Sequence, residues 1–381
     1  MNSDLREIRD MLDAIDRKLI ELFTQRMDII NEVAEVKRES NISISDEARE
    51  QEITDRMVDL SKPEYTGEAK TFTRTLLSLS KYRQRKLLFD NKEEELLPPS
   101  RKPPETNITV SYQGVAGAWG EQASIQMFKD NKKIGLDSFE DVFQSVKDGK
   151  VDYGVVPIEN SRTGAIGEVY DLLRKYGCYI VAQTWVPVRH CLIANKGAKI
   201  EDIREVFSHP EGFRQCGNFL KGRAWDLTSC RNTAVAVEMV AMEKENRRIA
   251  AIGSKRAADL HDLDIIVPDI IDDKANKTRF IAIASAPEYD EACDTISITF
   301  SVSHRSGALC EVLFHFMSAG INLSRIESRP MMGNKYCFFA DLEGNILDKN
   351  VTRGIRNALA CCGYLEVLGC YKSDLKVEMT D

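Results

Sequence analysis

Apolar residues recur in a regular pattern near the start of this 381-residue chain. The spacing between them alternates between three and four, which places them in one stripe along a single long helix. The stripe comprises Leu5, Ile8, Leu12, Ile15, Leu19, Leu22, Ile29, Val33 and Val36. Because a helix with an apolar stripe must bury it against another element, the pattern predicts an all-helical module over residues 1–90.

The stripe is interrupted at Arg26, and a cation in a buried seam requires an anionic partner. Lys37 lies eleven residues later and, at about 100° per residue, faces nearly the same direction. Arg9 has a similar orientation but lies 17 residues before Arg26, roughly 25 Å along the axis. Two arginines that far apart cannot contact one small ligand. If both serve one site, Arg9 comes from a second chain, which predicts an antiparallel dimer through the long helix.

Two further sets of polar residues fall on helical faces. Asp46, Arg49 and Glu50 share one face, and Ser80 and Gln84 lie one turn apart in a predicted helix over residues 72–89. Taken alone, each set is typical of a solvated helix surface.

Together, these residues resemble the active site of the helical chorismate mutases, over residues 4–90. Chorismate rearranges to prephenate in one concerted step, which needs clamped carboxylates and hydrogen-bond donors at the ether oxygen rather than a nucleophile. The resemblance implies a substrate pocket made of Arg9, Arg26, Lys37, Asp46, Arg49, Glu50, Ser80 and Gln84.

Within that pocket, the resemblance implies distinct roles. Arg26, and Arg9 from a partner chain, hold carboxylates. Lys37 and Gln84 reach the ether oxygen, and Arg26, Lys37 and Gln84 are the residues expected to assist the reaction. Glu50 and the helix start at Asp46 hold the substrate hydroxyl, while Arg49 and Ser80 complete the pocket.

Residues 91–106 are charged and rich in proline, which predicts a linker between domains. From residue 107, strand and helix patterns alternate. A buried-strand pattern over residues 153–158 ends in a polar cluster, residues 159–164, and helix-compatible sequence resumes at Ala165. Such strand ends hold small anions in α/β proteins, because free N–H groups and the helix dipole point there. The alternative is a polar turn that only caps the helix.

Other predicted strand ends and helix starts in this segment also carry hydroxyls, amides and cations. They include Ser208 and His209, Gln215, Thr233, and the pair Thr278 and Arg279. Their convergence predicts two α/β lobes that close on an anionic small molecule.

This segment resembles prephenate dehydratase, through VPIENSRTG (156–164), SHPEGFRQC (208–216), AAIGSKRAA (250–258) and NKTRF (276–280). The resemblance implies a two-lobed domain over residues 107–285, like a periplasmic binding protein. It also implies decarboxylation of prephenate with loss of its ring hydroxyl. By position, Thr278 donates to the leaving hydroxyl, and Arg279 binds a carboxylate or anchors the threonine. The other residues assigned to the cleft are Asn160, Ser161, Ser208, Gln215 and Thr233.

Two residues of this segment have a second possible role, and one differs from the family pattern. Glu159 is a candidate acid, but it also fits a structural hydrogen bond. His209 is a candidate general acid, although a histidine before proline at a strand end is more often structural. The family usually has a serine where this chain has Gly120, so backbone N–H groups of that loop are expected to serve instead.

Residues 294–372 show the order strand, helix, strand, strand, helix, strand, which is ferredoxin-like. The segment resembles the ACT regulatory domain of prephenate dehydratases, which implies that L-phenylalanine binds there. The residues implied are Gly307, Ala308, Leu309, Asn322, Glu327, Ser328 and Arg329. The alternative is a structural or dimerisation module without a ligand.

Composition excludes several other functions. The net charge of −8 argues against general nucleic-acid binding, and no apolar run is long enough to span a membrane. All ten cysteines lie from Cys178 onward without metal-ligand spacing, which indicates a reduced, cytoplasmic protein without structural zinc. We expect no metal and no cofactor.

The sequence therefore predicts a bifunctional enzyme that makes phenylpyruvate from chorismate and is inhibited by L-phenylalanine. We expect a homodimer or a homotetramer. Two alternatives remain open: an arogenate dehydratase, and a two-lobed ligand sensor without catalytic activity.

Overall fold

The computed structural model describes residues 3–40, 42, 44, 46–89, 95–129, 131–331 and 335–373. The chain divides into two compact units. The first comprises Met1–Glu95, Arg305–Ala319 and Arg353–Gly363, and the second comprises Leu96–His304, Gly320–Thr352 and Tyr364–Asp381. None of the helices in the described part is both long enough and apolar enough to cross a bilayer.

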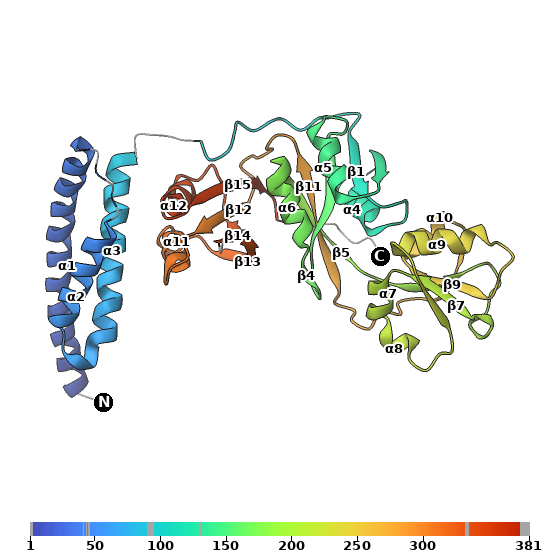
Figure 1. Cartoon of the computed structure of the whole chain (residues 1–381), viewed down its shortest axis with the longest axis horizontal. Coiled ribbons are helices and arrows are strands. Elements are labelled where there is room, and N and C mark those ends of the chain that lie inside the picture. The colour runs from blue at the N-terminus through green and yellow to red at the C-terminus, as the bar shows by residue number, and fades with distance from the viewer. Residues whose placement is uncertain are drawn as a thin grey trace. The chain divides into compact units, whose positions relative to one another are not determined.

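Three helices form the N-terminal part of the first unit: α1 (Ser3–Glu39), α2 (Glu47–Asp59) and α3 (Thr66–Phe89), with the short 3-10 helix η1 (Pro63–Tyr65) before α3. Both α1 and α2 pack on α3, and α1 runs beside α3 (Figure 1). The whole predicted stripe lies on α1, so the prediction of one long helix is confirmed. Helix α2 begins after Asp46, whose carboxylate accepts the backbone N–H of Arg49 and caps the helix.

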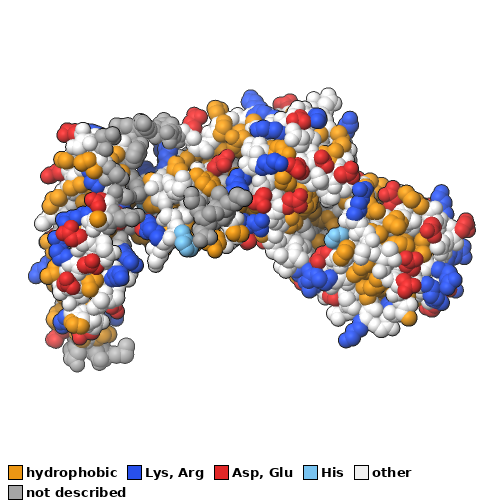
Figure 2. All heavy atoms as spheres, in the orientation of Figure 1, with side chains coloured by type: hydrophobic (Ala, Val, Ile, Leu, Met, Phe, Trp, Pro, Cys, Tyr) orange, Lys and Arg blue, Asp and Glu red, His pale blue; other side chains and the backbone are white. Residues whose placement is uncertain are grey.

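Most of the apolar stripe of α1 is exposed in the single chain. Leu12 is 53% exposed, Ile15 is 52% exposed and Ile29 is 59% exposed. Apolar side chains lie at the surface of the helical unit among charged ones (Figure 2). A contiguous exposed stripe of this kind is typical of an interaction surface.

The second unit begins with a lobe built on a six-stranded sheet, in the order β2-β1-β3-β11-β5, with β4 paired to β3. Strands β1, β2 and β3 are parallel, whereas β11 is antiparallel to both β3 and β5. The strands are β1 (Thr109–Gln113), β2 (Lys132–Leu136), β3 (Tyr153–Asn160), β4 (Gly164–Ala165), β5 (Tyr179–Pro187) and β11 (Lys277–Ala284). The helices are α4 (Trp119–Phe128), α5 (Phe139–Lys147) and α6 (Gly167–Tyr176).

The second lobe is a five-stranded sheet in the order β10-β6-β9-β7-β8. Its strands are β6 (Cys191–Ala194), β7 (Glu205–Ser208), β8 (Asp226–Ser229), β9 (Ile249–Gly253) and β10 (Asp264–Val267). Its helices are η2 (Ile200–Asp202), α7 (Pro210–Gln215), α8 (Gly217–Leu220), α9 (Thr233–Met242) and α10 (Lys255–Leu260). The two lobes are confirmed, and the chain crosses between them twice, after β5 and before β11 (Figure 1).

The second crossing has a consequence for the site. Strand β11 returns to the first lobe and inserts between β3 and β5, so that Thr278 lies opposite Asn160. The polar turn after β3 and the TRF segment, more than a hundred residues apart in sequence, are thereby neighbours in one sheet.

The last sheet has four antiparallel strands in the order β13-β14-β12-β15. They are β12 (Thr295–Val302), β13 (Leu323–Met331), β14 (Lys335–Glu343) and β15 (Tyr364–Tyr371). With α11 (Ala308–Ser318) and α12 (Lys349–Leu359), the chain follows the predicted ferredoxin-like order. The sheet shares a core with the first lobe, in which Phe339 and Leu368 pack with Ile158 and Ile180.

Candidate active sites

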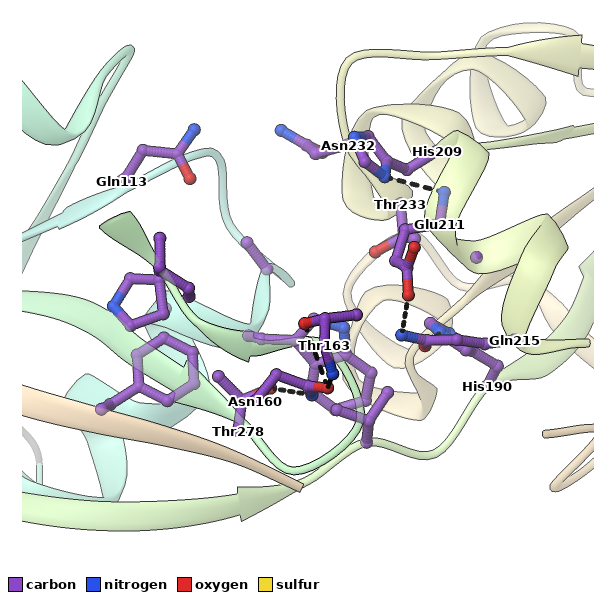
Figure 3. Close-up of a pocket in the computed structure, with 18 of the residues that line it drawn as sticks. Gln113, Asn160, Thr163, His190, His209, Glu211, Gln215, Asn232, Thr233 and Thr278 are labelled. Atoms are coloured by element: carbon purple, nitrogen blue, oxygen red, sulfur yellow. Dashed lines mark hydrogen bonds between the residues drawn. The ribbon is translucent and has the colours of Figure 1, made fainter. Parts of the chain in front are cut away.

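A cavity of about 300 Å³ lies between the two lobes of the second unit. Its walls come from the ends of β3 and β11 on one side, and from the crossing after β5 and the starts of α7 and α9 on the other. Figure 3 shows Asn160, Thr163 and Thr278 on one side of the cavity and His190, Gln215 and Glu211 on the other. This is the cleft that the polar strand ends predicted.

Asn160 fixes the hydroxyl of Thr278. The Asn160 amide Nδ2 donates to Thr278 Oγ1 at 3.0 Å and to Asn276 Oδ1 at 2.8 Å. Asn160 Oδ1 accepts the backbone N–H groups of Arg162 and Thr163, at 3.0 and 3.1 Å. Because the amide is held at both ends, Thr278 Oγ1 is an acceptor toward Asn160. Its hydroxyl hydrogen is then available to donate into the cleft.

Gln215 links two other cleft residues on the opposite wall. Its Nε2 donates to Glu211 Oε1 at 2.8 Å, and its Oε1 lies 2.9 Å from His190 Nε2. Hydrogen bonds from Arg214 lower the pKa of Glu211, so this carboxyl is ionised at neutral pH. Burial lowers the pKa of His190, which is 1% exposed.

The two lobes are joined beside the cleft. Glu121 of α4 forms a bidentate pair with Arg256 of α10, at 2.8 and 3.0 Å. Gly117 has a φ of +87°, and a Cβ there would lie 2.8 Å from the Cβ of Ala257 in the other lobe. Glycine is therefore required at this close approach of the two lobes.

Gly120 also has a steric explanation. It lies in the first turn of α4 and lines the cleft, and a Cβ there would lie 3.1 Å from the carbonyl oxygen of Gln113. A serine would require that carbonyl to shift. Free N–H groups at the start of α4 remain for an anion.

Only some of the residues that the resemblance assigned to prephenate line the cleft. Asn160, Gln215, Thr233 and Thr278 line the cleft. Ser208 does not, because it is fully buried and donates to the carbonyl of Ile252 at 3.1 Å.

Ser161 and Arg279 lie outside the cleft lining. Ser161 accepts the backbone N–H of Lys277 at 3.0 Å, which is a strand-end contact. Arg279 follows Thr278 on β11, and successive side chains of a strand point to opposite faces. Its guanidinium therefore lies on the far side of the sheet, where Nη1 donates to Asp341 Oδ2 at 2.6 Å and Nε donates to Gln183 Oε1 at 2.6 Å. The expectation that Arg279 binds a prephenate carboxylate in this cleft is not met.

Glu159 faces the same side as Arg279. Its Oε2 lies 3.2 Å from Arg325 Nε and 3.7 Å from Arg279 Nη1. This placement agrees with the structural alternative for Glu159. His209 lines the cleft but also caps α7, since its Nδ1 accepts the backbone N–H of Glu211 at 3.1 Å.

Sequence reasoning did not single out His190, Trp119 or Phe280, which also line the cleft. His190 begins the second lobe and contacts the indole of Trp119 edge-on, with ring centroids 5.8 Å apart. The sequence signal that could have identified His190 is a polar residue at a crossing between lobes. Its pairing with Gln215 could not be read from the sequence.

In the helical unit, several residues assigned to chorismate lie together. Arg26 of α1 donates to the hydroxyl of Ser80 on α3, and burial lowers the pKa of Arg26. Lys37 Nζ donates to the carbonyl of Ile44 at 2.8 Å. Gln84 is 5% exposed, and its Oε1 has no hydrogen-bond partner among the described residues.

The other residues of that set are arranged differently. Glu50 pairs with Lys81, which the sequence did not single out, at 2.9 Å. Arg49 pairs with Glu52 on the exposed face of α2. Arg9 is exposed on α1. Within one chain, the structure thus brings Arg26 and Ser80 into contact but leaves Arg9 at the surface.

The family model of prephenate dehydratase matches residues 110–288, and that of type II chorismate mutase matches residues 8–85. An Arabidopsis thaliana arogenate dehydratase/prephenate dehydratase is 35% identical over 71% of this chain and 74% of its own length. The chain belongs to the prephenate dehydratase family.

Two further similarities extend this assignment. A bifunctional chorismate mutase/prephenate dehydratase from Enterobacter agglomerans is 29% identical over 98% of each chain. The crystal structure of prephenate dehydratase from Arthrobacter aurescens, in complex with L-Phe, is 27% identical. The structural match covers 70% of this chain and 90% of the Arthrobacter aurescens chain, with a TM-score of 0.63.

The residues expected to hold phenylalanine lie on the C-terminal elements. Gly307 precedes α11 with a φ of +86°, a conformation that favours glycine. Asn322 and Ser328 are exposed. Arg329 donates to Asp171 Oδ2 of α6 at 3.4 Å, so it faces the first lobe in this chain. Within the described residues, no group of three His, Cys, Asp or Glu side chains is placed to hold a metal ion.

Proposed function

We infer that this chain is a bifunctional enzyme of phenylalanine biosynthesis. It rearranges chorismate to prephenate in the helical unit and converts prephenate to phenylpyruvate, carbon dioxide and water in the two-lobed cleft. The observation that carries the inference is the Thr278 hydroxyl, which Asn160 holds as a donor toward the cleft. The match over almost the full length of a bifunctional relative supports both activities on one chain.

In the dehydratase reaction, Thr278 donates to the ring hydroxyl as it leaves. Arg279 lies on the other face of the sheet, so it does not hold a carboxylate here. The substrate carboxylates are held instead by the N–H groups at the starts of α4 and α9, where Gly120 and Thr233 line the cleft, and by Arg231. The aromatic ring formed in the reaction supplies the driving force.

In the mutase reaction, the protein clamps chorismate and stabilises charge at the ether oxygen. Arg26, oriented by Ser80, holds a carboxylate. Lys37 and the buried amide of Gln84 serve the ether oxygen, where negative charge grows in the transition state. Arg9 completes the site from a second chain. The exposed apolar stripe of α1 is the surface on which the two chains pair as an antiparallel dimer.

We also propose that L-phenylalanine binds to the C-terminal module and inhibits the dehydratase. The ferredoxin-like order of β12–β15 supports this, as does the relative from Arthrobacter aurescens, whose structure contains L-Phe. The pocket would use Gly307, Ala308, Leu309, Asn322, Glu327, Ser328 and Arg329. The ten cysteines are all free thiols, which fits a cytoplasmic enzyme.

Arogenate dehydratase activity is the second candidate. Three relatives that are 33–35% identical carry arogenate dehydratase in their names. Arogenate has an ammonium group where prephenate has a keto group. The ratio of kcat/KM for the two substrates decides between them.

The decisive experiment supplies the purified chain with chorismate or with prephenate and follows phenylpyruvate by its absorbance in alkali. We expect product from both substrates, and a lower rate from prephenate when L-phenylalanine is added. Unchanged prephenate would contradict the dehydratase assignment and favour a ligand sensor. An unchanged rate at saturating phenylalanine would contradict the regulatory assignment alone.

A further inference from the structure

His190 has a buried ring nitrogen without a partner. The side chain is 1% exposed and lines the cleft, and its Nδ1 has no hydrogen-bond partner among the described residues. Buried polar atoms are nearly always hydrogen-bonded, so an exception in a cleft indicates a group that meets the ligand. The edge-on indole of Trp119 packs against the ring and helps to hold it in place.

The other ring nitrogen is fixed by a chain of three side chains. The Glu211 carboxylate can only accept, so Gln215 must turn its Nε2 toward Glu211, at 2.8 Å. Gln215 Oε1 then faces His190 Nε2 at 2.9 Å and accepts its hydrogen. Arg214 holds Glu211 from the other side through Nε at 2.8 Å. His190 therefore keeps its hydrogen on Nε2 and presents Nδ1 as an open position for a second proton.

The reaction needs a proton at the leaving oxygen. The prephenate dianion and one proton give the phenylpyruvate anion, carbon dioxide and water. The bond between the ring and its carboxylate breaks, its electron pair enters the ring, and the bond to the hydroxyl breaks. A threonine hydroxyl stabilises the departing oxygen by hydrogen bonding, but it is too weak an acid to be the net source of this proton.

Among the described residues, four titratable side chains line the cleft: His190, His209, Glu211 and Arg231. Glu211 is ionised through Arg214, and an arginine stays protonated. Nδ1 of His209 is occupied by the backbone N–H that it caps. Among these four side chains, His190 has the open nitrogen. It lies at the crossing after β5, where the Val188 N–H donates to the carbonyl of Asn276, two residues before Thr278, at 2.9 Å.

We propose that His190 is the catalytic residue that protonates the leaving hydroxyl through Nδ1, and that Gln215 and Glu211 are positioning residues for it. This deepens the dehydratase assignment and rests on it. Burial lowers the pKa of His190, and the negative charge of Glu211 opposes this effect. A dianionic substrate beside the ring favours its cation further, so binding draws the proton in.

The test compares single-turnover rates for prephenate across pH in the full chain. Urea unfolding followed by tryptophan fluorescence shows that the second unit of each variant is folded, since all three tryptophans lie in that unit. His190→Gln retains a polar group at the Nε2 position but cannot carry a proton. We expect the rate to fall by about 10²–10⁴-fold, the range for a lost general acid. We also expect the pH–rate profile of the variant to lose its alkaline limb, the range in which the wild-type rate falls as pH rises.

Two further variants separate catalysis from structure. Glu211→Gln removes the negative charge that favours the His190 cation, so its alkaline limb moves to lower pH while the rate at low pH recovers. His209→Asn, the matched control, keeps a helix-capping acceptor and retains the alkaline limb. Retention of that limb in His190→Gln overturns the proposal whatever the rate. A wild-type chain without activity on prephenate would instead refute the dehydratase assignment itself.

Discussion

Arg279 Nη1 lies 2.6 Å from Asp341 Oδ2, although the two residues belong to different sheets. Arg279 follows Thr278 on β11, and Asp341 lies on β14 of the C-terminal sheet. The Arg279 guanidinium is also bound by Gln183, and by the hydroxyl of Tyr371 at 3.0 Å. The strand that carries the cleft hydroxyl is therefore anchored to the C-terminal sheet by a buried cation.

Loss of this pair should destabilise the second unit. Asp341→Asn leaves Arg279, which is 6% exposed, with a weaker set of acceptors. We expect a decrease of about 2–4 kcal/mol in the free energy of unfolding, because the buried cation loses its nearer carboxylate and keeps only that of Glu159, 3.7 Å away. Urea unfolding followed by tryptophan fluorescence measures this, since Trp119, Trp185 and Trp225 all lie in the second unit.

The matched control is Glu343→Gln, two residues further along β14. Glu343 is exposed, so its replacement should change stability by less than about 0.5 kcal/mol. Equal effects of the two variants would show that the buried pair has no special contribution.

The hydroxyl of Thr278 should be needed for the dehydratase and not for the mutase. Thr278→Val preserves the shape of the side chain but removes the group that Asn160 orients. We expect the dehydratase kcat to fall by about 10²-fold or more, the range for loss of a donor to developing negative charge. Thr278→Ser, which keeps the hydroxyl, should recover most of the rate. A valine variant within about threefold of wild type would remove Thr278 from the reaction.

The mutase site should be shared between two chains. Arg9→Ala and Arg26→Ala should each abolish mutase activity and leave the dehydratase unchanged, because both lie on α1 of the helical unit. When the two inactive variants are mixed and allowed to exchange, random pairing makes half the dimers mixed, and each mixed dimer has one intact site. About a quarter of the wild-type mutase activity should return.

Arg38→Ala is the control for these substitutions, since Arg38 is exposed and pairs with Glu35 on the same helix. It should retain mutase activity. If the mixture of Arg9 and Arg26 variants stays inactive although chain exchange is detected, both arginines serve the same chain or Arg9 serves none.

The second unit should lose stability as the solution is acidified through the histidine range. Burial lowers the pKa of His190 below its usual 6.5, so the unfolded chain binds more protons than the folded one between these two values. The contribution is fully present above pH 6.5 and is lost as pH falls through the folded pKa, with a slope of up to about 1.4 kcal/mol per pH unit. Tryptophan-detected urea unfolding between pH 7.5 and 5.5 measures this.

His190→Gln should flatten that dependence, because the variant has no group that titrates at this position. The pKa values of Glu121 and Glu211 are lowered below the usual 4.5. These two groups therefore titrate at more acidic pH and do not obscure the comparison. An identical pH dependence in the variant would assign the destabilisation to other groups.

The sequence by itself determined the features that depend on local spacing. The alternation of three and four places Leu5 through Val36 on one face of one helix, whatever surrounds it. The polar turn after residue 158 and the TRF segment could be assigned to strand ends because each strand is bounded by its own residues. These signals are carried within a few turns or one strand, where backbone geometry fixes which side chains share a face.

Tertiary structure alone decided which face of each strand met the cleft. Thr278 and Arg279 are adjacent, yet one lines the cavity and the other joins a buried ion pair, because the two faces of β11 are covered by different elements. The role of His190 likewise depends on Gln215, 25 residues away. A strand's sequence fixes that neighbouring side chains alternate, but only long-range packing determines what each of them faces.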